Sequence, residues 1–214
     1  MRLILVRHGD AHAGFHGVIG GVRGCLGLTD LGRRQADALC ARLAGSQAIR
    51  PDVLLSSTLP RAIETADIIA PALGLDIGGH DADLCEVDPG EADGLTWAEY
   101  GLHHGSFDME GEPDRIFAPA GESWNSFHDR VHRTLVRFAE EYADQTVLAV
   151  CHAGVIIASL RILLDMPPAG GATQLRPTNT GLTEWSHDLE RERWTLHTFN
   201  DAAHLIGLDD GSAG

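Results

Sequence analysis

The 214-residue chain contains no lysine, and all 16 of its basic residues are arginines. Without lysine, the protein cannot form a lysine Schiff base, anchor pyridoxal phosphate or use a P-loop lysine. No stretch approaches the roughly 18 consecutive apolar residues that a membrane-spanning helix needs, so no span is expected. The four cysteines (25, 40, 85 and 151) have neither metal-type nor redox-type spacing, which predicts reduced thiols.

Positive charge is scarce in this sequence, whose formal net charge is −15 at pH 7. This balance argues against nucleic acid or an anionic membrane as a partner. The first residues lead directly into an apolar run without a signal-peptide pattern, which predicts a cytoplasmic location. Length and composition are ordinary for a globular protein and predict a single domain over residues 1–206, followed by a loose tail over 207–214.

Three short apolar runs, each typical of a buried strand, are followed by a cation or an imidazole. The runs are 3–6, 53–55 and 147–150, and the groups that follow them are Arg7, His8, Arg61 and His152. Because chemistry in open α/β sheets gathers beyond the carboxyl ends of the strands, we expect these side chains to converge. Arginine binds phosphate through a planar fork, and imidazole acts as nucleophile or donor. The pattern therefore predicts a site for a tetrahedral dianion.

Four sequence blocks occur in an order that covers most of the chain. They are Leu5-Val6-Arg7-His8-Gly9, residues 56–66, Leu84-Cys85-Glu86 and Cys151-His152-Ala153-Gly154. In these blocks the chain resembles the histidine phosphatase superfamily, the phosphoglycerate mutase-like group that includes broad-specificity phosphatases. The resemblance implies a three-layer α/β/α sandwich with a mostly parallel central sheet. It also implies hydrolysis of a phosphate monoester through a covalent phosphohistidine.

The resemblance assigns a role to each block. It makes His8 the nucleophile and Glu86 the general acid and base, with Asp88, Glu91 and Asp93 as alternatives for the acid. The phosphate clamp consists of Arg7, Arg61 and His152. No cofactor and no metal are expected, because the arginines supply the positive charge.

Two further residues are candidates for substrate contacts. Arg23 lies in a glycine-rich loop over residues 10–28, where the alternative is an arginine exposed on a solvated loop. Asn179 precedes the last predicted hairpin, where an asparagine often braces the site in relatives, and a plain turn residue is the alternative.

Residues 81–122 contain 12 acidic residues and one basic residue, Arg115. We interpret this segment as a lid-like insertion over the active-site end. Its charge disfavours a phosphoglycerate mutase, which must retain a highly anionic bisphosphate, and favours hydrolysis of a small phosphorylated substrate with a neutral or cationic remainder. Mutase-type phosphoryl transfer and a non-catalytic binding protein on the same fold remain alternatives. The oligomeric state is open, and a homodimer is possible.

Helical periodicity and capping signals predict helices over 29–45, from residue 60 to about 71, over 96–100, over 123–142 and over 155–164, with a hairpin over 182–199. His128 and His132 have an i, i+4 spacing that suits a metal, but no third ligand is evident. We expect both to be exposed helix residues. The pattern assigns no role to His12, His16, His103 or His104.

Overall fold

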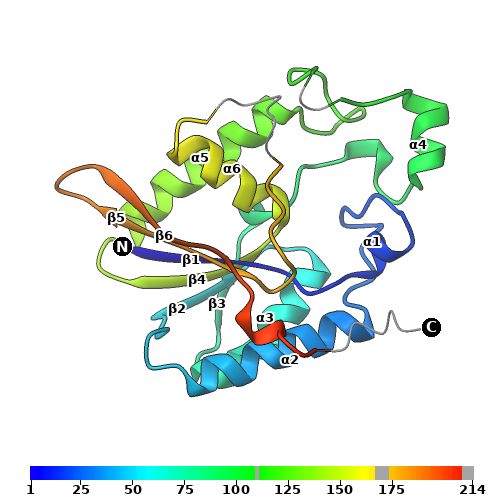
Figure 1. The fold of residues 1–214 in the computed structure, drawn as a ribbon. Coiled ribbons are helices and arrows are strands. Elements are labelled where there is room, and N and C mark those ends of the chain that lie inside the picture. The colour runs from blue at the N-terminus through cyan, green and yellow to red at the C-terminus, as the bar shows by residue number, and fades with distance from the viewer. Residues whose placement is uncertain (109–110, 167–173, 209–214) are drawn as a thin grey trace.

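A six-stranded mixed sheet forms the centre of the protein, in a computed structural model that describes residues 1–108, 111–166 and 174–208 (Figure 1). The strands are β1 (Arg2–Arg7), β2 (Val53–Ser56), β3 (Ile77–His80), β4 (Thr146–Cys151), β5 (Leu182–Asp188) and β6 (Arg193–Asp201). Their order is β3-β2-β4-β1-β5-β6, with the first four parallel and the β5–β6 hairpin antiparallel. The predicted mostly parallel sheet is confirmed.

Helices cover both faces of the sheet, which gives the predicted three layers (Figure 1). On one face lie α2 (Asp30–Gly45) and α3 (Pro60–Leu73), and on the other lie α5 (Trp124–Glu141) and α6 (Ala153–Leu163). Because successive strand residues point to opposite faces, Leu3 and Leu5 join the apolar cluster with α5 and α6, whereas Ile4 and Val6 pack with α2 and α3. The strand ends are thereby held between two apolar cores.

The shorter helical elements lie in the connections. They are α1 (His12–Phe15), α4 (Trp97–His104) and the single 3₁₀ turns Ala82–Leu84, Gly90–Ala92 and Ala203–Leu205. In Figure 1, α1 and α4 lie beyond the end of the sheet that is opposite the N-terminus. None of the helices in the described ranges is long and apolar enough to cross a membrane. Residues 209–214 of the predicted tail lie outside the described residues.

Side-chain caps explain where α2, α4 and α5 begin. The hydroxyl of Thr29 accepts a hydrogen bond from the amide of Gly32 at 3.0 Å, which makes Thr29 the N-cap of α2. Capping boxes begin α4 at Thr96 and α5 at Ser123. Helix α3 includes Pro71 and ends at Gly74, whose φ of 65° is easily adopted only by glycine.

Two glycines allow the loop after β1 to lie directly against the first turn of α2. A Cβ on Gly9 would stand 2.5 Å from the carbonyl oxygen of Gly32, and a Cβ on Gly32 would stand 2.8 Å from the amide nitrogen of Asp10 and still closer to its carbonyl oxygen. These neighbours are backbone atoms, so the clash could be relieved only by moving the loop that carries His8 and Gly9.

Gly32→Ala is therefore expected to lower the free energy of unfolding by about 1–3 kcal/mol, measured by urea denaturation. Gly45→Ala, in the same helix but with no atom within 4 Å of the added methyl, is the matched control. It is expected to raise stability by about 0.4–1 kcal/mol, because alanine restricts the unfolded chain. Equal effects of the two substitutions would contradict the close approach.

Candidate active site

A cavity of about 480 Å³ lies at the carboxyl end of the parallel strands. Five of the residues predicted from the sequence line it, namely Arg7, His8, Arg61, Glu86 and Asn179. They come from the end of β1, the first turn of α3, the segment after the first 3₁₀ turn and the turn before β5. His152 is fully buried beside them, and its ring centroid lies 5.0 Å from that of His8.

The hydrogen bonds of His8 define its tautomer. Its Nδ1 lies 2.6 Å from the carbonyl oxygen of Gly9, which can only accept, so Nδ1 carries the proton. Arg61 Nε donates to Nε2 at 3.1 Å, which requires a lone pair on that nitrogen. Burial lowers the pKa of His8 well below its ordinary value, and the positive charges of Arg61 and Arg7 lower it further. His8 is therefore a neutral imidazole whose lone pair is on Nε2.

Among the described residues, no carboxylate forms an ion pair with Arg7 or Arg61. Arg61 is 6% exposed and donates from Nη1 to the carbonyl oxygen of Gly20 at 2.7 Å. Arg7 donates to the carbonyl oxygen of Pro177 at 2.6 Å, and its buried Nε has no hydrogen-bond partner among the described residues. Burial lowers the pKa of Arg7, although the charges of Glu86 and Asp10 oppose this. Two guanidinium groups in this state form a site for an anion.

His152 occupies the N-cap position of α6, and its ring forms a hydrogen bond with a side chain. Its Nε2 lies 2.7 Å from the hydroxyl of Ser57, which also accepts a hydrogen bond from the amide of Leu59 at 3.3 Å. Its Nδ1 is buried and has no hydrogen-bond partner in the described ranges. Burial, followed by the charges of Arg61 and His8, lowers the pKa of His152 well below its ordinary value, so the ring is neutral.

Glu86 is fixed by two backbone amides. Its Oε2 accepts from Gly154 at 3.0 Å, and its Oε1 accepts from Val87 at 3.1 Å. Among the four carboxylates considered for the acid, Glu86 alone lines the cavity. Asp88 accepts from the amide of Gly90, and Asp93 accepts from two amides of the loop after β1.

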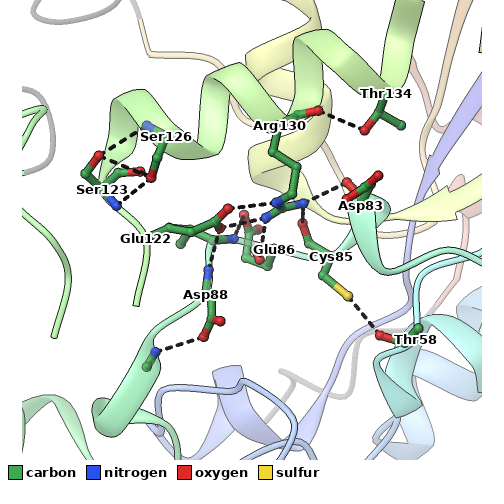
Figure 2. A network of polar contacts seen from close by, with 12 residues as sticks. Thr58, Asp83, Cys85, Glu86, Asp88, Glu122, Ser123, Ser126, Arg130 and Thr134 are labelled. Atoms are coloured by element: carbon green, nitrogen blue, oxygen red, sulfur yellow. Dashed lines mark hydrogen bonds and ion pairs between the residues drawn. The ribbon is translucent and has the colours of Figure 1, made fainter. Parts of the chain in front are cut away.

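Arg130 of α5 holds the backbone of the segment that carries Glu86 (Figure 2). Its guanidinium donates to the carbonyl oxygens of Asp83 at 2.7 Å, Cys85 at 3.0 Å and Glu86 at 3.2 Å. It also binds both carboxylate oxygens of Glu122 at 2.7 Å each. Burial alone would raise the pKa of Glu122, but hydrogen bonds from Arg130 and from the amide of Asp88 lower it overall. No local sequence pattern predicts this pair.

Asn179 and Arg23, the remaining predicted residues, differ in position. Asn179 Nδ2 donates to the carbonyl oxygen of His8 at 2.9 Å and so holds the backbone of the nucleophile candidate. Arg23 is 67% exposed, its Nε lies 3.7 Å from Asp93, and it does not line the cavity. Its position favours the alternative of an arginine on a solvated loop.

The predicted exposure of the two histidines of α5 is confirmed for His132 and wrong for His128. His132 is exposed as predicted, but His128 is half-buried, its ring centroid lies 4.5 Å from that of Trp124, and its Nε2 is buried without a hydrogen-bond partner among the described residues. An aromatic neighbour one helical turn earlier covers the ring, and the i, i+4 spacing gives no sign of this. Within the described ranges, no group of three or more His, Cys, Asp or Glu residues could hold a metal ion.

His128 makes stability depend on pH between the ordinary pKa values of carboxylates and of histidine. Burial and the charge of Arg161 lower its pKa to about 4. Between that value and about 6.5, the unfolded chain binds more protons than the folded one, so stability is lost as the pH falls through this window. Urea denaturation at pH 7.5 and pH 5 should show this loss, and His128→Phe should reduce it. His132→Phe, an exposed control on the same helix, should leave the pH dependence unchanged.

Residues 3–202 match the sequence profile of the histidine phosphatase superfamily (branch 1). A bifunctional protein of Mycobacterium tuberculosis is 38% identical over 165 residues, which are 77% of this chain and 44% of that protein, so the chain spans less than half of its length. The metal-independent phosphoserine phosphatase of Arabidopsis thaliana is 29% identical over 96% of this chain and 84% of its own.

A solved structure with the same architecture is that of the phosphoserine phosphatase of Entamoeba histolytica in complex with 3-phosphoglyceric acid. It superposes with a TM-score of 0.76 at 27% identity and covers 95% of this chain and 98% of its own. The six-stranded sheet and its helical layers therefore agree with a fold that carries phosphatase sites.

Proposed function

Because the chain belongs to the histidine phosphatase superfamily, we propose that it hydrolyses phosphate monoesters through a covalent phosphohistidine on His8. The observation that carries the proposal is the tautomer of His8. A neutral imidazole with its proton fixed on Nδ1 and its lone pair on Nε2 is ready to attack phosphorus. Relatives named as phosphatases agree with this class of reaction.

In the first step, His8 Nε2 forms a bond to phosphorus while the bond from phosphorus to the ester oxygen breaks. Arg7 and Arg61 neutralise the charge on the other phosphate oxygens. When phosphate binds, Arg61 Nε releases Nε2 of His8 and donates its hydrogen bond to the substrate instead. His152 contributes through Nδ1, which donates once the hydroxyl of Ser57 donates to Nε2. Glu86, as a carboxylic acid, gives its proton to the leaving oxygen.

In the second step, Glu86 is a carboxylate and takes a proton from water as the water oxygen attacks phosphorus. The bond between phosphorus and Nε2 breaks, which releases inorganic phosphate and returns His8 and Glu86 to their starting states. No step uses a metal ion, because the two arginines supply the positive charge. The arginines that line the cavity are Arg7 and Arg61, and the transferred phosphate uses both. A mutase must also retain a highly anionic bisphosphate, so hydrolysis is favoured over mutase chemistry.

The test is release of phosphate from p-nitrophenyl phosphate in the presence of EDTA by wild type and His8→Ala. Activity that persists in EDTA, disappears in the variant and is accompanied by an alkali-stable phosphoenzyme on wild type supports the proposal. Activity lost with EDTA would exclude the metal-free mechanism, and a fully active variant would exclude His8. Interconversion of phosphoglycerates faster than their hydrolysis would establish the mutase instead.

A further inference from the structure

Beyond its charged groups, the cavity is lined by apolar side chains. Val18 and Ile19 come from the loop after β1, Trp97 and Phe117 from the long connection between β3 and α5, Trp124 from α5 and Ile157 from α6. We propose that the preferred substrate is a phosphate monoester of an apolar alcohol of about the size of an aromatic ring, without a second anionic group. This inference rests on the phosphatase function proposed above and names its substrate class.

The cavity has few positively charged side chains that could bind a second anionic group of the substrate. Residues 109–110, 167–173 and 209–214 contain no arginine or histidine, so every basic side chain lies in the described ranges. Of these, Arg7, His8 and Arg61 line the cavity, and the proposed reaction assigns all three to the transferred phosphate. A carboxylate on the leaving group would therefore enter the cavity without a positive partner of its own.

Two arginines of the segments that also contribute to the lining have partners of their own. Arg23 binds Asp93 and the carbonyl oxygen of Gly90. Arg115 binds Glu112 and two backbone carbonyl oxygens.

The acidic side chains of the cavity make this shortage of cations more severe. Asp10 and Glu86 are themselves part of the lining, and because the proposed first step uses Glu86 in its protonated form, Asp10 is the side chain that supplies a like charge. Transfer of an unpaired carboxylate from water into an apolar site is costly, and a like charge nearby adds repulsion. The sequence predicted a neutral or cationic remainder from the charge of residues 81–122, and the apolar lining narrows this prediction to a neutral, apolar group.

The exposure of Trp97 adds to the argument for an apolar ligand. It is the first residue of α4, lines the cavity and is 54% exposed, and its ring lies edge-on at 5.9 Å from that of the buried Phe117. A large aromatic side chain half exposed beside a cavity gains when an apolar group covers it. Leu102, on the same helix, is 84% exposed and does not line the cavity, so it is a matched control.

The experiment compares three phosphate esters of primary alcohols, which differ little in intrinsic reactivity, with the full-length protein. They are phenethyl phosphate, glycerol phosphate and phosphoserine. We expect kcat/KM for phenethyl phosphate to exceed that for phosphoserine by about 10- to 100-fold, the factor that burial of an aromatic side chain provides. Glycerol phosphate, whose leaving group is neutral but polar, should lie between them.

Trp97→Ala tests the contact directly. It should lower kcat/KM for phenethyl phosphate about 10-fold, mainly through KM, and leave that for phosphoserine within about 2-fold. Leu102→Ala should change neither value. Because both side chains are at least half exposed, both variants are expected to fold.

Each outcome of this comparison decides one question. Phosphoserine turned over as fast as phenethyl phosphate, or faster, would overturn the apolar substrate class and leave the phosphatase function intact. An equal loss for both esters in Trp97→Ala would show that Trp97 does not select the leaving group and would also count against the proposal. Failure to hydrolyse any of the three esters or p-nitrophenyl phosphate, with no phosphoenzyme, would overturn the proposed function, and the inference with it.

Discussion

Gly154→Ala is expected to lower kcat for an alkyl phosphate about 10²- to 10⁴-fold with little change in thermal stability. A Cβ on Gly154 would stand 2.9 Å from Cδ of Glu86 and closer still to Oε1, and 3.1 Å from the ring of Phe127. The carboxylate is the far end of a flexible side chain and can move away, so the fold survives. Glu86 then loses the amide of Gly154 and its place in the cavity.

A comparison of two leaving groups distinguishes loss of the general acid from loss of substrate binding. p-Nitrophenolate leaves without protonation, so kcat for p-nitrophenyl phosphate should fall much less than kcat for the alkyl ester. Gly101→Ala, a helical glycine in α4 with no atom within 4 Å of the added methyl, is the control and should leave both values unchanged. The double variant Gly154→Ala/Glu86→Gln should be no slower than Glu86→Gln alone, and additive losses would contradict the mechanism.

The part of the site that local sequence patterns predicted is the part built on strand ends, whereas Glu86 and Asn179 were assigned through the family resemblance. Arg7 and His8 follow an apolar run directly, and Arg61 and His152 follow two others at short distance. Because parallel strands end at one edge of the sheet, adjacency in sequence became adjacency in space. The helices were predictable for a similar reason, since caps and apolar periodicity are local signals, as at Thr29 and Ser123.

The parts that escaped prediction depend on contacts between distant residues. Strand β3 contains Gly78 and Gly79, which lack β propensity, and it is defined by pairing with β2. Arg130 bonds to carbonyl oxygens more than 40 residues away, a contact that no local pattern in α5 indicates. The burial of His128 depends on how α5 packs. The apolar lining of the cavity was missed because its side chains come from four separate segments.

Arg130→Met is expected to lower the free energy of unfolding by about 3–5 kcal/mol, because Glu122 would remain as a largely buried charge without its partner. The side chains of Arg130 and Glu122 are 13% and 19% exposed. The carbonyl oxygens of Asp83, Cys85 and Glu86 would also lose their common donor, so kcat should fall about 10- to 100-fold as Glu86 shifts. Arg133→Met, an exposed neighbour on α5, should change stability by no more than about 0.5 kcal/mol.

Two further measurements separate positioning from charge pairing. The double variant Arg130→Met/Glu122→Leu removes both charges and should regain most of the stability, but not kcat, since the three carbonyl oxygens stay unbound. The pKa of Glu122 is lowered in the folded protein, so the stabilisation by the pair is present above about pH 4.5 and is lost as the pH falls through the folded pKa. The stability difference between wild type and Arg130→Met should therefore shrink below that pH. If the double variant regained full kcat, Arg130 would be stabilising the fold without positioning Glu86.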